Sequence, residues 1–174
     1  MSKEKALFNV GVFGIPAKLI DGVVHIKVNV RTDQAYQKKQ ANLPEDSPLL
    51  LVDCPGGAVK PGDTSLFGAL VREIREETGG CNIDQLDEFR PPLELMKDST
   101  KNYDLAFWMP VCLIGKPKPS DEVSDHPWVS LEDLASETKY RVISGLGLAG
   151  RTGRMMAAAF AFYENRKECP ETFS

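Results

Sequence analysis

Residues 55–79 read Pro-Gly-Gly-Ala-Val-Lys-Pro-Gly-Asp-Thr-Ser-Leu-Phe-Gly-Ala-Leu-Val-Arg-Glu-Ile-Arg-Glu-Glu-Thr-Gly, and the rest of the chain is organised around them. A glycine-rich loop runs directly into a helical pattern that carries clustered carboxylates. Gly56 and Gly57 allow backbone atoms to approach a metal or a phosphate closely. A helix that starts at Asp63, Thr64 or Ser65 offers free N–H groups and a positive dipole end. The loop and the helix are therefore predicted to form one site for a metal and a phosphate.

The predicted helix places three glutamates on one arc. At 100° per residue, Glu76 and Glu77 lie about 60° and 40° to either side of Glu73. Charges held so close repel one another unless a cation neutralises them. Carboxylate oxygens beside a phosphate favour Mg²⁺, with Mn²⁺ as a substitute, over zinc. Arg72 precedes Glu73 and lies four residues before Glu76, where it can orient a carboxylate. An apolar stripe beside the acids, Phe67, Leu70, Val71 and Ile74, faces the expected core.

This stretch resembles the signature box of the Nudix hydrolases, G-x5-E-x7-R-E-U-x-E-E-x-G-U with U aliphatic. Gly57 opens the box, and residues 72–79, Arg-Glu-Ile-Arg-Glu-Glu-Thr-Gly, match its second half without exception. Asp63 stands where the family has Glu, one extra residue separates it from Arg72, and Gly80 replaces the last aliphatic residue. An insertion inside the helix would rotate its acidic face by about 100° against the loop. The extra residue is therefore expected before the first helical turn.

The resemblance implies a Nudix fold of the α/β (α+β) class, with a mixed β-sheet sandwiched between α-helices. It also implies Mg²⁺-dependent hydrolysis of the diphosphate linkage in a nucleoside diphosphate joined to another moiety, in which metal and water act together. The expected metal ligands are Gly57, Glu73, Glu76 and Glu77. Gly56 and Gly57 are expected at the substrate, and Arg72 is expected to support catalysis. A Nudix-fold module that binds a nucleotide or a protein without catalysis is the alternative.

Residues outside the box extend the resemblance. The segment 121–134 resembles the part of the family in which acids precede a Trp-Val-x-Leu-x-x-Leu strand and helix. Glu122 and Asp125 are its candidates for a further metal ligand or the general base, and solvated loop acids are the alternative. Tyr103 and Trp108 are candidates to stack on a nucleobase. The alternative is that these aromatic residues belong to the core of a strand.

Length, charge and cysteine usage limit the other functions. A chain of 174 residues suits one core, so residues 1–174 are predicted to form a single domain. A net charge of -4 at pH 7 argues against a broad nucleic-acid surface. No apolar run reaches membrane-spanning length, and no targeting signal is found. The four cysteines are widely spaced, which suggests neither a zinc site nor a disulfide framework. A cytoplasmic protein with a small-molecule substrate is expected.

Strands are predicted on both sides of the box. Asp21-Gly22 indicates a hairpin between one or two short strands in residues 7–20 and a strand over 23–30, because a type I′ turn needs positive φ at both central positions. The polar residues 31–47 are predicted to form an insertion with one helical turn around 34–40. Further strands are predicted at 49–52, 81–95 and 103–113. The last of these has apolar residues on both faces, as in a strand buried between two layers.

The end of the chain offers two patterns. Residues 145–150, Gly-Leu-Gly-Leu-Ala-Gly, fit a dinucleotide-binding turn, but only 24 residues follow, too few for the returning strand and its acid. Residues 152–166 are predicted to form a helix that is apolar over most of its circumference. Such a helix is either deeply packed or part of a subunit interface, so a homodimer is one alternative.

Overall fold

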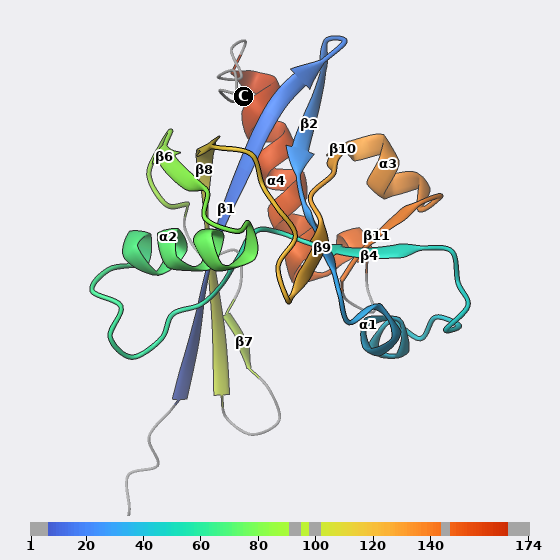
Figure 1. The fold of residues 1–174 in the computed structure, drawn as a ribbon, viewed down its shortest axis with the longest axis horizontal. Coiled ribbons are helices and arrows are strands. Elements are labelled where there is room, and N and C mark those ends of the chain that lie inside the picture. Colours follow the sequence, from blue (N-terminus) through green and yellow to red (C-terminus); the bar gives the residue numbers. More distant parts are fainter. Residues whose placement is uncertain (1–6, 91–94, 98–101, 144–146, 167–174) are drawn as a thin grey trace, which may run out of the picture.

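The computed structural model describes residues 7–90, 95–97, 102–143 and 147–166 (Figure 1). The strands are β1 (Leu7–Ile20), β2 (Val23–Lys27), β3 (Asn29–Arg31), β4 (Leu50–Asp53), β5 (Gly56–Ala58), β6 (Asn82–Gln85), β7 (Leu95–Lys97), β8 (Asn102–Ile114), β9 (Val123–Asp125), β10 (Trp128–Ser130) and β11 (Tyr140–Val142). The helices are α1 (Gln34–Gln40), α2 (Leu66–Glu77), α3 (Leu131–Ser136), α4 (Arg151–Asn165) and the 3-10 helix η1 (Gly147–Ala149).

Two long parallel strands form the centre of the larger sheet. β1 and β8 pair from Leu7 with Asn102 to Pro16 with Val111. This sheet has the order β10-β2-β1-β8-β6, with β5 also paired to β1 and β7 to β8. A smaller sheet has the order β11-β4-β3-β9. Because β1 pairs in parallel with β8 and antiparallel with β2 and β5, the larger sheet is mixed, as predicted.

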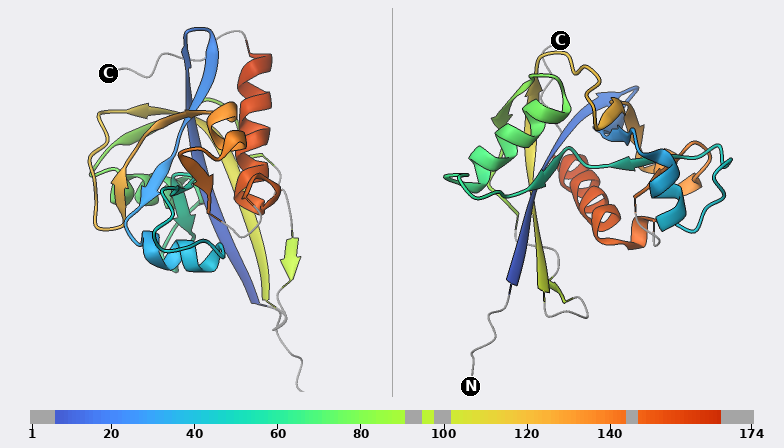
Figure 2. Two further views of the ribbon diagram at one scale, coloured as in Figure 1. Left: turned by 90° about the vertical axis from the view of Figure 1, so that its right-hand side faces the viewer. Right: turned by 60° about the horizontal axis from the view of Figure 1, so that its bottom comes forward.

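Helices cover both faces of the β1–β8 pair, with α2 on one side and α4 on the other (Figure 2). Alternate residues of β8 enter two separate cores, because successive side chains of a strand point to opposite faces. Ala106 and Trp108 pack with α4, while Met109 and Val111 pack with α2. The predicted sandwich of a mixed sheet between helices is confirmed, and so is the burial of residues 105–113 between two layers.

Helix α4 packs deeply within the chain. Met155, Met156, Ala159 and Phe160 are each at most 1% exposed. The hydroxyl of Tyr163 donates a hydrogen bond of 2.7 Å to the Ile15 carbonyl, which fixes the helix against β1. Ala157 and Ala161 lie on the opposite, exposed side of the helix. The buried face of α4 is thus accounted for inside one chain, and a subunit interface stays a prediction.

The structure confirms the predicted hairpin at Asp21-Gly22 and the predicted helical turn around residues 34–40, but it divides the strands differently. Asp21 and Gly22 have φ of 51° and 79°, so the predicted positive φ at both positions is confirmed. Residues 7–20 form one long strand instead of one or two short ones. The strand predicted over 23–30 is divided into β2 and β3. Helix α1 confirms the predicted turn at 34–40, and β4 confirms the strand predicted at 49–52.

The strand predicted over residues 81–95 is wrong from residue 86 to residue 89, where the described chain leaves the ladder. β6 ends at Gln85, and only an isolated bridge between Arg90 and Trp108 follows before residues 91–94, which lie outside the described part of the chain. Leu86 donates to the Pro110 carbonyl at 3.1 Å. Pro110 has no N–H to donate in return, so the regular ladder is interrupted here and returns only as the Arg90–Trp108 bridge.

Candidate active site

Helix α2 starts after the extra residue of the box. Ser65 is its N-cap, and the Ser65 side chain accepts a hydrogen bond of 2.9 Å from the Gly68 N–H. The first helical residue is Leu66, so the insertion lies in the loop and leaves the register of the acids intact. The predicted position of the extra residue before the first helical turn is confirmed.

Arg72 is held by the loop on one side and by the acids on the other. Its Nε and Nη2 donate to the two oxygens of Asp63 at 3.0 and 2.8 Å, and Nη2 also donates to the Ala58 carbonyl at 3.0 Å. Its Nη1 donates to Glu73 and, at 3.3 Å, to Glu76. These hydrogen bonds lower the pKa of the Asp63 carboxyl to about 2. Asp63 and Arg72 together fix the acidic face of α2 against the loop.

Gly56 and Gly57 lie on β5, which pairs with β1 and passes close to the glutamates. The Gly56 N–H donates a hydrogen bond of 2.7 Å to Glu77. Gly56 has a φ of 135°, and a Cβ there would overlap the Val12 carbonyl oxygen. A Cβ on Gly57 would lie 2.5 Å from Oε2 of Glu73. Only glycine at both positions lets the strand pass so close to the two carboxylates.

Glu77 is buried where an anion is costly. It is 4% exposed, and burial, followed by the charge of Asp53, raises the pKa of its carboxyl to about 8. Arg31 is its nearest cation, with Nη1 4.0 Å from Glu77 Oε1. Glu73 is also buried, and Glu76 is half exposed. A divalent cation would offset the cost of gathering these three carboxylates, so the residues present fit such an ion.

The described residues contain no cluster of three or more acid, histidine or cysteine side chains already arranged around one point. Instead, Lys60 and Arg72 hold the acids. Lys60 Nζ lies 3.3 Å from Glu73 Oε1 and 3.3 Å from Glu76 Oε2. Together with Arg72, Lys60 therefore supplies the positive charge of this acidic face.

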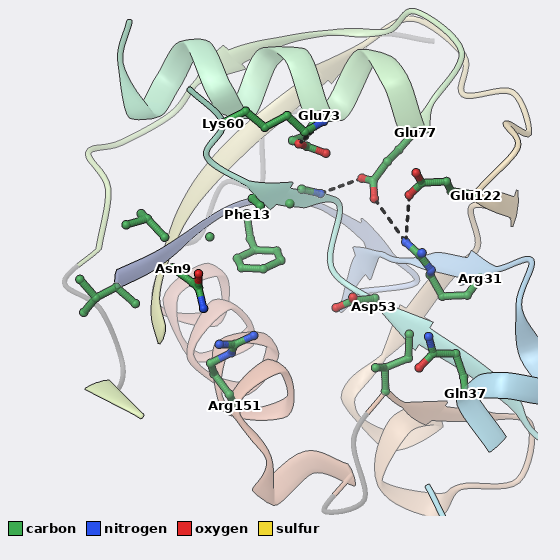
Figure 3. A pocket seen from close by; sticks show the side chains of 17 residues that line it. Asn9, Phe13, Arg31, Gln37, Asp53, Lys60, Glu73, Glu77, Glu122 and Arg151 are labelled. Carbon is green, nitrogen blue, oxygen red and sulfur yellow. Dashed lines mark hydrogen bonds and ion pairs between the residues drawn. The ribbon is translucent and has the colours of Figure 1, made fainter. Parts of the chain in front are cut away.

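Glu122 lies near Glu77, with which it shares the Arg31 guanidinium as an ion-pair partner (Figure 3). Its side chain is 70% exposed, and its carboxylate lies 3.5 Å from Nη1 of Arg31, the atom that faces Glu77 (Figure 3). Asp125 follows on β9, where its carboxylate accepts a hydrogen bond of 2.7 Å from the His126 N–H. Of the two acids expected in this segment, the structure brings Glu122, and not Asp125, to the glutamates.

A cavity of about 480 Å³ joins these groups (Figure 3). Its polar lining includes Arg31, Asp53, Gly56, Gly57, Lys60, Glu73, Glu77, Glu122 and Arg151. A neighbouring hollow of about 450 Å³ shares Glu73, Glu77 and Glu122 and adds Glu76. The predicted acids, glycines and Glu122 thus meet at one place, with cations and carboxylates facing one another.

Of the two predicted aromatic residues, Trp108 lies outside the cavity. Trp108 is 3% exposed and packs edge to face on Phe162, so it does not line the cavity. The side chain of Tyr103 lies outside the described part of the structure. Phe13 and Leu105 line the cavity instead. No spacing in the sequence links Phe13 to the box, because its place depends on the pairing of β1 with β5.

Arg31 and Asp53 are further lining residues that sequence reasoning missed. Asp53 ends the apolar strand β4 shortly before the glycine loop. A charged residue at the end of an apolar strand, next to that loop, could have indicated a site residue. Arg31 ends β3, in the segment interpreted as a polar insertion. Gln34 of α1 ties that segment to β4, donating to the Leu51 carbonyl at 2.9 Å and accepting from the Leu51 N–H at 2.8 Å. The start of the insertion is therefore a wall of the cavity.

An α/β sandwich with an acidic helix face against a glycine strand is the arrangement expected for a metal-assisted phosphoanhydride hydrolase. A family model described as NUDIX domain matches residues 25–145. The chain therefore belongs to the Nudix hydrolase family and is a Nudix-type hydrolase.

Solved structures show the same fold. The solution structure of the E. coli ORF135 protein is 21% identical, with 92% of this chain and 94% of that chain covered and a TM-score of 0.56. The MutT protein from Methanosarcina mazei Go1 is also 21% identical, with coverages of 95% and 100% and a TM-score of 0.55. An Ap4A hydrolase from C. elegans is 16% identical, with coverages of 88% and 98% and a TM-score of 0.54. A search of curated proteins found no match.

Proposed function

We propose that this protein hydrolyses, with Mg²⁺, the diphosphate linkage of a nucleoside diphosphate joined to another moiety. The observation that carries the proposal is the meeting of Glu73, Glu76 and Glu77 with the Gly56–Gly57 strand. All five residues adjoin one open cavity system that also exposes Arg31 and Lys60. Carboxylates for a hard cation beside cations for phosphate oxygens suit a diphosphate better than a neutral substrate.

Glu73, Glu76 and Glu77 would hold the metal, with the Gly57 carbonyl as a backbone ligand. When bound, the ion would neutralise phosphate charge and lower the pKa of a water. Arg72 keeps Glu73 and Glu76 in place through the contacts that anchor it to Asp63. Glu122 is exposed at the rim of the cavity, where its carboxylate can take the proton of an attacking water.

The inner part of the cavity suits the organic part of the substrate. Phe13 and Leu105 give it apolar walls, and Asp53 and Arg151 add polar groups. Asp53 accepts a hydrogen bond of 2.8 Å from the Cys54 N–H through one oxygen, Oδ1. A cavity of about 480 Å³ with a few polar groups lies within the usual size of small-ligand sites.

A substrate panel with Mg²⁺ tests this proposal. It would contain nucleoside triphosphates, nucleotide sugars, ADP-ribose and dinucleoside polyphosphates. Release of a nucleoside monophosphate or a second phosphorylated fragment is expected from at least one of them. The same release should be lost in Glu76→Gln and in Glu77→Gln. Tight nucleotide binding without turnover in Mg²⁺ or Mn²⁺ would instead support a binding module.

Three broader expectations accompany this proposal. Residues 1–174 are expected to form one domain with its insertion at 31–47, and the protein is expected in the cytoplasm. None of the described helices has the length and apolar character of a membrane span. A homodimer stays a prediction that light scattering after size-exclusion chromatography would test.

A further inference from the structure

Lys60 lies where positive charge is needed between two glutamates. Its ammonium is 3.3 Å from both Glu73 Oε1 and Glu76 Oε2, the oxygens that Arg72 Nη1 also contacts. Figure 3 shows the Lys60 side chain running along the rim of the cavity to reach Glu73. Within the described part of the chain, these two carboxylates are the only charged partners of the ammonium.

The two cations at this position differ in freedom. Arg72 is fixed by two hydrogen bonds to Asp63 and one to the Ala58 carbonyl, and its side chain is 25% exposed. Lys60 is 55% exposed and is held only by the two carboxylates it bridges. A lysine ammonium is a compact point charge on a flexible stem, so it can leave without disturbing the loop. Arg72 is therefore anchored to the loop by its own hydrogen bonds, whereas the described contacts of the Lys60 ammonium are those to the two carboxylates.

We propose that Lys60 serves two partners in turn: its ammonium bridges Glu73 and Glu76 in the metal-free protein, is displaced when a divalent cation binds there, and then binds a phosphate of the substrate. The inference rests on the proposed function, because it takes Glu73 and Glu76 as metal ligands. Because the divalent cation takes the place of the Lys60 ammonium, a positive charge lies beside Glu73 and Glu76 both with and without metal. The exchange also delivers a cation to the substrate only when the site is loaded.

The position of Lys60 supports the second half of the exchange. Lys60 and Arg31 both line the cavity, so each can meet a phosphate bound there. Displacement from Glu73 and Glu76 would release the ammonium from both of its carboxylate contacts. A negatively charged phosphate of the metal-bound diphosphate would therefore attract it, by a charge-assisted hydrogen bond.

The exchange can be observed without turnover. Lysine labelling by reductive methylation, read by mass spectrometry, should modify Lys60 slowly in EDTA and several-fold faster in saturating Mg²⁺. Lys116, which is exposed and outside the site, serves as the internal reference and should not change. Unchanged labelling of Lys60 in a wild-type protein that binds Mn²⁺ would overturn the exchange while leaving the metal site standing. Absence of any Mn²⁺ binding would overturn both.

Two affinities then separate the two roles. In Lys60→Met, Mn²⁺ should bind about two- to five-fold tighter by calorimetry, since an exposed ion pair no longer competes. With Mg²⁺ saturating, methylenediphosphonate should bind about tenfold more weakly, because one charge-assisted contact is lost. Lys116→Met should change neither value. A variant that was merely misfolded would weaken both, so opposite shifts support the proposal. Parallel losses, or no shift in either, would overturn it.

Discussion

Asp63 binds Arg72 through both of its carboxylate oxygens, at 3.0 and 2.8 Å. The family box has Glu where this chain has Asp63, and one residue more separates it from Arg72. The residues between Asp63 and Arg72 include a loop segment before Leu66, and Asp63 reaches the guanidinium in spite of its shorter side chain. Asp63, at the box position usually held by Glu, is therefore the acid that anchors Arg72 in this chain.

Asp63→Asn should loosen the acidic face without unfolding the protein. One charged acceptor of Arg72 is lost, and Arg72 in turn orients Glu73 and Glu76. Loss of such a supporting partner typically reduces metal affinity or activity by about 10- to 100-fold. Calorimetry with Mn²⁺ would measure the change, with Asp84→Asn on the exposed side of β6 as the matched control. Equal affinities in wild type and Asp63→Asn would contradict this account of Asp63.

Metal binding should stabilise the fold through Glu77. At a metal concentration about 100 times Kd, the melting temperature should rise by roughly 5–10 °C for a chain of this size. In Glu77→Gln the rise should disappear, although the side-chain carbonyl can still accept the Gly56 N–H. Differential scanning calorimetry with Mg²⁺ and with EDTA would show both effects. Glu164→Gln, on the exposed side of α4, should keep the full rise.

Gly56 and Gly62 allow backbone strain to be separated from steric overlap. Both have positive φ, 135° and 105°, but only a Cβ on Gly56 would meet other atoms, those of Val12 and Phe13. Gly62→Ala should therefore cost about 1–2 kcal/mol of unfolding free energy. Gly56→Ala should cost clearly more, about 3 kcal/mol or above, because β5 must move away from β1. Urea unfolding measures both, and a smaller cost for Gly56→Ala would refute the predicted overlap.

Lys27 should make stability depend on pH in the alkaline range. Its Nζ lies 4.3 Å from the centre of the Trp128 ring and donates to the His126 carbonyl at 2.9 Å. Burial, followed by the charge of Lys18, lowers the pKa of Lys27 from 10.5 to about 8. Between these values the unfolded chain binds more protons than the folded one, so unfolding free energy rises with pH.

The measurement is urea unfolding of wild type and Lys27→Met at several pH values from 7 to 10.5. The contribution of Lys27 is the difference between the two proteins, in which other titrating groups cancel. This difference should be flat below about pH 8 and shift in favour of the wild type above it. A difference that stays constant over the whole range would show that Lys27 titrates normally in the folded protein.

The sequence predicted correctly those features that depend only on residues close together in the chain. The helical spacing of Glu73, Glu76 and Glu77 places them on one face, and the turn at Asp21-Gly22 needs no tertiary information. The loop position of the extra residue followed from the requirement that this face keep its register. The expected fold followed from the resemblance carried by the box.

The rest depended on long-range pairing that a sequence pattern does not contain. Trp108 and Phe13 are both buried aromatic residues of one core, and only the tertiary structure shows that Phe13 also lines the cavity while Trp108 does not. Lys60 and Arg31 look like surface charges until β5 and β3 bring them to the acids. The strand predicted past Gln85 failed because Pro110, on its partner strand, has no N–H.

Glu122 and Asp125 give a matched pair for the identity of the general base. Glu122 is near the glutamates and lies 3.5 Å from Arg31, whereas Asp125 is bound to the His126 N–H on β9. Glu122→Gln should lower kcat by about 10²- to 10⁴-fold, as for loss of a positioned base. Because its side chain is 70% exposed, the melting temperature should hardly change. Asp125→Asn should keep kcat near the wild-type value, and the reverse order of the two variants would assign proton transfer to Asp125.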